Sequence, residues 1–292
     1  MEIKPNNIYH GDSYELIKQI PDKSVDLIYT DIPYLIESHG YGKSELSARL
    51  MNRDDELKGK KDKLQKKVDE LKKEMENAKT KDEYERAHWH VDNALNKLNL
   101  LTDQDITKGI DYKILDEFVR VCKYIYIYIW CSKDQIYDLL QYFVGKHHCR
   151  FNILVWCKTN GVPATNDTFL PNLETCLVFK EKGTPRYNDG YELKSKWYVS
   201  QTNKADKELY SHPTIKPLEL VKRHLLHSTN KGDVVLDCFM GSGTTCVAAK
   251  ELGRKYIGIE INEKYYQIAK DRLNGITQKE KKNNAVQIKL FD

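Results

Sequence analysis

The chain has no apolar run that approaches the length needed to cross a bilayer, and its amino terminus has no apolar signal core. Its seven cysteines include no Cys-x-x-Cys pair and have no nearby cysteine–histidine ligand set. Several of them lie in apolar runs typical of strands, which favours reduced core thiols over disulfides or a metal site. These absences predict a soluble, cytoplasmic protein with no bound metal and no membrane contact.

A strong charge of one sign is also lacking. The chain carries 47 lysines and arginines against 43 aspartates and glutamates, a net charge of +4. No global field would draw such a protein to polyanions, so any contact with nucleic acid must come from local clusters. The length of 292 residues suits one large α/β domain with insertions.

Two apolar runs, each ending in a distinctive loop, are the most informative segments. The first covers residues 25–30 and leads into Asp31-Ile32-Pro33-Tyr34. The second, Val234-Val235-Leu236, leads into Asp-Cys-Phe-Met-Gly-Ser-Gly-Thr-Thr at residues 237–245. Open α/β sheets place their ligand sites where buried strands end, so both loops are candidate parts of a site.

Strand and helix patterns alternate along most of the remaining chain. The alternation predicts an α/β fold with a doubly wound, mainly parallel sheet. The spacing of apolar residues predicts helices over residues 13–20, 114–121, 134–144, 218–227, 245–252 and 263–273, and strands over residues 8–10, 124–130, 151–156, 175–179 and 256–260.

Residues 43–110 interrupt this alternation. From about residue 54 to residue 101 the chain is dense in charge of both signs and has no proline. Apolar residues recur every three or four positions in two arms, one from Leu64 and one from Tyr84, and Thr80 and Glu83 between the arms have the form of a capping box. The pattern predicts an α-helical hairpin whose arms each extend roughly 30–37 Å. A solvated arm without contacts is the alternative.

The order of the two loops, tetrapeptide first and glycine loop last, is informative in itself. In this order they resemble the catalytic tetrapeptide and the S-adenosylmethionine loop of the amino-group DNA methyltransferases of the β group, which methylate adenine N6 or cytosine N4. The resemblance covers residues 1–42 and 111–275, and it implies a Rossmann-like methyltransferase domain. The hairpin and the C-terminal tail, residues 276–292, lie outside it.

The glycine loop is the expected cofactor site. Gly241 and Gly243 allow the backbone to approach a ligand closely, and the loop enters a helix whose amino terminus suits the methionine carboxylate. Glu260, about 20 residues on, would hold the ribose diol. A phosphate-binding P-loop is excluded because no lysine follows Gly243, and a dinucleotide fingerprint would need a third glycine.

The resemblance extends the cofactor site to residues outside the glycine loop. Asp12 would reach the adenine amino group of S-adenosylmethionine, and Thr214 and Lys216 in His-Pro-Thr-Ile-Lys-Pro would lie near its methionine end. The full predicted cofactor-binding set is Asp12, Thr214, Lys216, Asp237, Phe239, Gly241, Gly243, Thr244, Thr245 and Glu260.

The tetrapeptide fits the chemistry of an exocyclic amine, whose lone pair is delocalised into the base. Asp31 and the carbonyl group of Ile32 would accept the two N–H groups and draw the nitrogen towards tetrahedral geometry. Pro33 fixes the turn, and Tyr34 offers a ring on which a flipped base can stack. The family usually has proline where this chain has Ile32, but any residue supplies a carbonyl group. Direct displacement then needs no metal and no covalent intermediate.

Aspartate at the first position of the tetrapeptide is typical of enzymes that act on adenine N6, whereas serine is commoner for cytosine N4. We therefore expect an adenine-specific enzyme. Cytosine N4, an amino group in RNA, and a DNA-binding or partner-docking protein without turnover remain alternatives. Methylation at cytosine C5 is excluded because the chain has no Pro-Cys pair.

Two further segments predict partners. Residues 181–211 mix basic and aromatic residues where the family places its target-recognition segment, and the hairpin is a candidate second element for contact with DNA or with a second copy. Gln287–Phe291 resembles the peptide by which bacterial DNA enzymes bind the sliding clamp, although alternation over residues 286–291 also fits a final edge strand. The predicted contacts to double-stranded DNA are Lys182, Arg186, Lys194, Lys196, Trp197 and Tyr198.

Overall fold

The computed structural model describes residues 3–34, 53–78, 80–102, 109–160, 169–170, 172–185, 190–201 and 215–276. The chain divides into two compact units. We call Met1–Ile32 together with Ile110–Asp292 the sheet unit, and Pro33–Gly109 the hairpin unit. Three predicted features lie outside the described residues, namely Arg186, Thr214 and the tail segment Gln287–Phe291.

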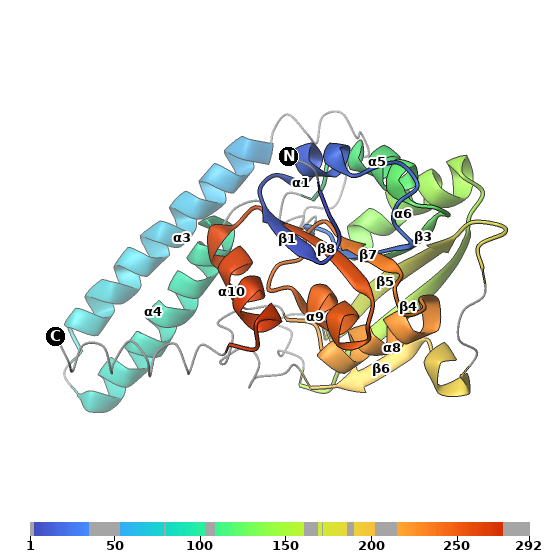
Figure 1. Ribbon diagram of the computed structural model, residues 1–292. Coiled ribbons are helices and arrows are strands. Elements are labelled where there is room, and N and C mark those ends of the chain that lie inside the picture. Colours follow the sequence, from blue (N-terminus) through green and yellow to red (C-terminus); the bar gives the residue numbers. More distant parts are fainter. Residues whose placement is uncertain are drawn as a thin grey trace. The chain divides into compact units, whose positions relative to one another are not determined.

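The sheet unit is built on an eight-stranded sheet in the part of the chain that the structure describes, with strand order β1-β8-β7-β2-β3-β5-β4-β6 (Figure 1). β5 runs antiparallel to both of its neighbours, β3 and β4, and the other pairs are parallel. The strands are β1 Asn7–His10, β2 Leu27–Asp31, β3 Tyr126–Cys131, β4 Arg150–Lys158, β5 Leu173–Lys180, β6 Trp197–Ser200, β7 Val234–Asp237 and β8 Lys255–Glu260.

Helices connect the strands and cover both faces of the sheet. The α-helices of the sheet unit are α1 Ser13–Leu16, α5 Ile114–Val121, α6 Ile136–Leu140, α8 Leu218–Ser228, α9 Thr244–Glu251 and α10 Glu263–Leu273. Shorter helical turns are η1 Ile17–Gln19, η2 Lys133–Gln135, η3 Gln141–Lys146, which is π-helical, and η4 Tyr191–Lys194.

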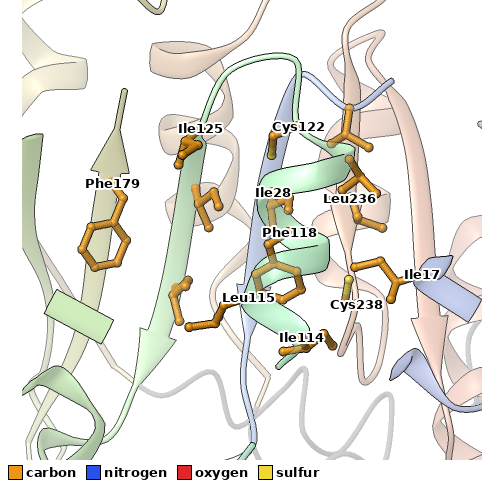
Figure 2. Close-up of a cluster of buried hydrophobic side chains, with 14 of the residues drawn as sticks. Ile17, Ile28, Ile114, Leu115, Phe118, Cys122, Ile125, Phe179, Leu236 and Cys238 are labelled. Carbon is orange, nitrogen blue, oxygen red and sulfur yellow. The ribbon is translucent and has the colours of Figure 1, made fainter. Parts of the chain in front are cut away.

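The core lies on both sides of the central strands because their residues alternate between the faces. On one face, Ile28 of β2 packs with Leu115 and Phe118 of α5 (Figure 2). On the other, Tyr29 of β2 packs with Val221 of α8. Burial on both faces explains why these strands read as continuous apolar runs rather than as an alternation of apolar and polar residues.

The predicted α/β fold is confirmed, with two differences in the sheet. The antiparallel β5 makes it mixed, although most pairs are parallel. β6 lies in the segment that showed no periodicity, where it pairs in parallel with β4 at the edge of the sheet. A strand of four residues is too short to establish a period, and Trp197 and Val199 are exposed while Tyr198 is half-buried.

The hairpin unit contains α3, Arg53–Glu76, and α4, Lys81–Thr102, which lie side by side in Figure 1. The predicted capping box is present, because the backbone N–H of Thr80 donates to Glu83 Oε2 over 3.3 Å and that of Glu83 to Thr80 Oγ1 over 3.2 Å. Val68 and Ala94 are buried between the helices, with Leu64, Leu71 and Leu95 packed around them. Both helices are rich in charge, and within the described residues no helix has the apolar length required to span a membrane.

Candidate active site

The two loops singled out by sequence follow neighbouring strands. β2 and β7 run parallel, so Asp31 and Asp237 end their strands at the same edge of the sheet. The Thr30 hydroxyl donates a hydrogen bond to Asp237 Oδ1 over 2.9 Å, and both side chains are buried. The structure therefore joins the residue before Asp31 directly to the first residue of the glycine loop.

Asp31 is held by a lysine from a distant part of the sequence. Its carboxylate oxygen Oδ2 accepts a hydrogen bond from the Nζ atom of Lys216, which lies just before α8. The Lys216 side chain is only 9% exposed, whereas that of Asp31 is 31% exposed. The Lys216 ammonium also lies 5.1 Å from the centre of the Trp130 ring. The sequence predicted Lys216 at the methionine end of the cofactor, and the structure places its ammonium on the carboxylate of Asp31.

Glu174 is a member of the site that sequence reasoning missed. Its Oε2 atom lies 2.9 Å from Lys216 Nζ, and its Oε1 atom lies 2.5 Å from Lys158 Nζ. Burial would raise the pKa of Glu174, but the two lysine charges outweigh burial and lower that pKa to about 2. Glu174 lies on β5 and Lys158 ends β4, and no local sequence pattern links either residue to Asp31.

Ile32 lies at the end of the sheet unit, and Pro33 and Tyr34 begin the hairpin unit. The Ile32 side chain is buried, and its backbone N–H donates to the carbonyl oxygen of Trp130 over 3.2 Å. This bond continues the β2–β3 ladder by one residue beyond Asp31 and orients the Ile32 peptide. Within the hairpin unit, the carbonyl oxygen of Tyr34 accepts from the N–H of Gly109 over 3.3 Å.

The glycine loop is shaped by two residues with positive φ. Gly241 has φ 52° and Gly243 has φ 77°, a region that side chains other than hydrogen disfavour. A Cβ atom on Gly243 would lie 2.8 Å from the Cβ atom of Ala269 on α10, so this position is also closed by packing. Gly243 caps the amino terminus of α9, and the following Thr244 and Thr245 are buried.

Glu260 ties the glycine loop to the end of β8. Its Oε2 atom accepts from the N–H of Gly241 over 2.9 Å, and its Oε1 atom accepts from the N–H of Asn262 over 2.8 Å. Burial raises the pKa of Glu260, although these backbone donors oppose the shift. β1 pairs with β8 beside it, which brings Asp12 to the same edge, where its Oδ1 atom accepts from the N–H of Tyr14 over 2.8 Å and caps α1.

Asp237 is the most strongly perturbed carboxyl group at this edge. Burial raises its pKa to about 7, although hydrogen bonds from Thr245, Thr30 and the Phe239 N–H oppose the shift. Phe239 is half-buried, and its ring meets that of Tyr14 edge-on at a centroid distance of 6.4 Å. These contacts hold the loop in one shape from the end of β7 to the start of α9.

The predicted DNA contacts do not share one environment. Lys182, Lys194 and Lys196 are exposed, and Trp197 is 63% exposed on β6. Tyr198 points to the opposite face of the strand, where the guanidinium of Arg223 lies 5.2 Å from its ring centre. The lysines and Trp197 are thus exposed, whereas the Tyr198 ring packs against Arg223 of α8.

The chemistry of these groups fits S-adenosylmethionine. The edge of the sheet combines a loop with close backbone approach, the amino terminus of α9 and two carboxylates, Asp12 and Glu260, at the ends of β1 and β8. Carboxylates suit hydroxyl and amino donors, and free N–H groups suit a carboxylate.

Comparison with known proteins places the chain in a family. A family model described as DNA methylase, of the N6/N4 type, matches residues 25–271, and the chain belongs to this family. The Type II methyltransferase M2.LlaDCHI of Lactococcus lactis subsp. cremoris is 28% identical over 279 residues, which are 91% of this chain and 88% of that protein. M.HinfI of Haemophilus influenzae is 28% identical over 292 residues, covering 93% of this chain and 69% of that protein.

Two solved structures share the fold. The M1.HpyAVI–SAM complex has a TM-score of 0.57 and 23% identity, and the alignment covers 92% of this chain and 98% of that one. The cytosine-N4-specific PvuII DNA methyltransferase has a TM-score of 0.57 and 16% identity, with coverage of 93% and 87%. Family membership confirms the predicted class, an S-adenosylmethionine-dependent DNA methyltransferase, and the two solved structures confirm the predicted fold.

Proposed function

We propose that this protein transfers a methyl group from S-adenosylmethionine to the N6 amine of an adenine that is rotated out of duplex DNA. The observation that carries the proposal is the hydrogen bond from Thr30 to Asp237. It fixes the end of β2, where Asp31 would accept the target amine, against the loop that would hold the cofactor. Aspartate rather than serine at position 31 supports adenine over cytosine.

In this proposal the protein contributes positioning and electrostatics. Asp31 and the Ile32 carbonyl group accept the two N–H groups of the target amine, which frees its lone pair for in-line attack. Tyr34 stacks on the flipped base. Bound S-adenosylmethionine supplies an electrophilic methyl group on a sulfonium. Asp12, Glu260 and the glycine loop would hold the cofactor at the same edge of the sheet as Asp31.

We further propose that residues 181–211 contact the DNA. The exposed lysines Lys182, Lys194 and Lys196 suit phosphate groups, and the exposed ring of Trp197 suits a base or sugar. Arg186 belongs to the same proposal on sequence grounds. We expect Tyr198 to contribute less to DNA binding than Trp197, because the guanidinium of Arg223 already lies over its ring.

The experiment that tests the proposal is transfer of a radiolabelled methyl group to duplex DNA, followed by digestion and nucleoside analysis. We expect the label in N6-methyladenine. Label in N4-methylcytosine, or in RNA offered as a competitor, would overturn the choice of base or of nucleic acid. Absence of transfer under conditions where S-adenosylmethionine and DNA both bind would favour a DNA-binding protein without turnover.

We also propose, from sequence alone, that Gln287–Phe291 docks to a bacterial sliding clamp. In this proposal Gln287 lies at the rim of a pocket on the clamp, and Leu290 and Phe291 fill an apolar groove there. Such an anchor pair suits the capture of a short peptide segment. A peptide of residues 283–292 should bind purified clamp at ~100 μM, and a peptide with alanine at Leu290 and Phe291 should not. Equal behaviour of the two peptides would end the proposal. A cytoplasmic location is proposed with it, supported by seven free cysteine thiols.

A further inference from the structure

Four charged side chains from four parts of the sheet unit alternate in sign beside the target site. They run from Asp31 at the end of β2, through Lys216 before α8 and Glu174 on β5, to Lys158 at the end of β4. Each carboxylate oxygen of Glu174 lies within 2.9 Å of a different lysine. Two carboxylates and two ammonium groups leave the row neutral as a whole.

Lys216, which lies between Asp31 and Glu174 in this row, is too buried for water to be the main partner of its charge. Its side chain is 9% exposed, and burying an ammonium is costly unless opposite charges and hydrogen-bond acceptors surround it. Glu174 approaches it from β5, and the Trp130 ring lies 5.1 Å away. Trp130 is itself fixed, because its Nε1–H donates to the hydroxyl of Tyr29 over 3.0 Å.

Two carboxylates of the row pair with Lys216, and removal of Glu174 would leave Asp31 as the other one. The Lys216 ammonium already donates to Asp31 Oδ2, and without Glu174 its charge would no longer be divided between the two carboxylates of the row. The undivided charge would weaken Asp31 as an acceptor for the target amine, because a charge-assisted hydrogen bond competes with a neutral one. With Glu174 present, the ammonium is shared between two anions. Lys158 in turn holds Glu174 ionised and in place, in agreement with the lowered pKa of Glu174.

We propose that Glu174 is a positioning residue for methyl transfer, which holds the Lys216 ammonium so that it orients the carboxylate of Asp31 without neutralising it. The inference rests on the proposed function, because it assigns Asp31 to the target amine. It gives Lys216 a role at the acceptor carboxylate rather than at the cofactor.

Glu174→Gln tests the role with nearly unchanged side-chain volume. We expect the single-turnover rate of methyl transfer to fall about tenfold or more, while the Kd values for S-adenosylmethionine and for DNA change by less than about twofold. Glu219→Gln is the matched control, because Glu219 pairs with Lys222 over 2.9 Å on the exposed side of α8. It should leave the rate and both Kd values as in the wild type.

A double-mutant cycle separates positioning from a general structural role. If Glu174 acts through Lys216, Glu174→Gln should change the rate by less than about twofold when Lys216→Met is already present. Equal losses in both backgrounds, or a wild-type rate in Glu174→Gln, would overturn the inference. Absence of transfer by the wild-type protein would instead overturn the proposed function.

Lys158→Met covers the case in which Glu174→Gln does not fold. It leaves both carboxylates and Lys216 intact but removes the second lysine that holds Glu174. We expect a loss of rate of about threefold or more with unchanged Kd values. A wild-type rate in this variant would equally overturn the inference.

Discussion

Asp31 and the residue before it, Thr30, have different partners. The Asp31 carboxylate binds Lys216, and Thr30 binds Asp237 of the glycine loop. Asp31→Ala should therefore abolish turnover while leaving the Kd for S-adenosylmethionine within about threefold, because the loop keeps its own contacts to Glu260. Single-turnover methylation and calorimetric titration of the cofactor are the measurements. Retention of more than about a tenth of the wild-type rate would contradict the assignment of Asp31.

A second prediction at this scale concerns Gly243. Two separate features of this position favour glycine. Its φ is positive, and an added Cβ atom would lie 2.8 Å from the Cβ atom of Ala269. Gly243→Ala should lower the free energy of unfolding by about 2–4 kcal/mol and weaken cofactor binding, because α10 or the loop must move. Unfolding in urea and cofactor titration measure both effects.

Gly232→Ala provides the control for backbone strain alone. Gly232 has φ 87°, but nothing lies within 4 Å of an added Cβ. It should cost about 1–2 kcal/mol and leave cofactor affinity unchanged. If the two variants behaved alike, packing against Ala269 would not be what shapes the loop.

At the scale of elements, the hairpin unit supports a third prediction. The buried clusters of the sheet unit are drawn from residues of Met1–Ile32 and Ile110–Asp292, and α3 and α4 pack around Val68 and Ala94. Replacing residues 54–101 by a short Gly/Ser linker should leave the stability of the sheet unit within about 1 kcal/mol and its cofactor affinity intact. DNA affinity or dimerisation should fall.

Thermal unfolding, cofactor titration, DNA binding and light scattering measure these properties on the full chain and on the variant. Loss of both folding and cofactor binding would make the hairpin part of the core. An unchanged affinity for DNA together with an unchanged mass in solution would leave the hairpin without either proposed role.

The elements that the sequence predicts well are those whose periodicity is set by burial. Helices such as α10 and the hairpin arms have a clear apolar stripe, and the capping box at Thr80 marks a boundary by its own hydrogen bonds. β6 was missed because four residues at a sheet edge carry almost no period. The antiparallel direction of β5 depends on pairing between distant segments, which a local pattern does not contain.

The same distinction applies to the candidate site. Asp31 and the glycine loop are recognisable because each lies within a short motif at the end of a strand. The row from Asp31 to Lys158 joins residues 31, 158, 174 and 216, so it exists only after the sheet has formed. Glu174 gave no signal of its own because a single charged residue near the start of a strand is usually solvated.

At the scale of the whole molecule, two buried groups give the free energy of unfolding opposite dependences on pH. Burial lowers the pKa of His224 from 6.5 to about 3, so the folded protein holds this ring neutral. The stability that depends on the neutral ring is present above pH 6.5 and is lost as the pH falls towards 3. Asp237 behaves in the opposite sense, because burial raises its pKa from 3.8 to about 7.

The contribution of Asp237 is fully present below pH 3.8 and is lost as the pH rises through 7, because the unfolded chain then releases a proton that the folded chain retains. Asp237→Asn removes this titration and leaves that of His224. The free energy of unfolding of the variant, relative to wild type, should therefore increase by about 2–4 kcal/mol between pH 4 and pH 8. Urea unfolding of both proteins at several pH values measures this difference. The wild-type curve alone would not reveal the contribution of Asp237, because that of His224 has the opposite pH dependence between pH 3.8 and 6.5. A difference that does not vary with pH would show that Asp237 is ionised in the folded protein throughout this range, with the Thr30 and Thr245 hydrogen bonds outweighing its burial.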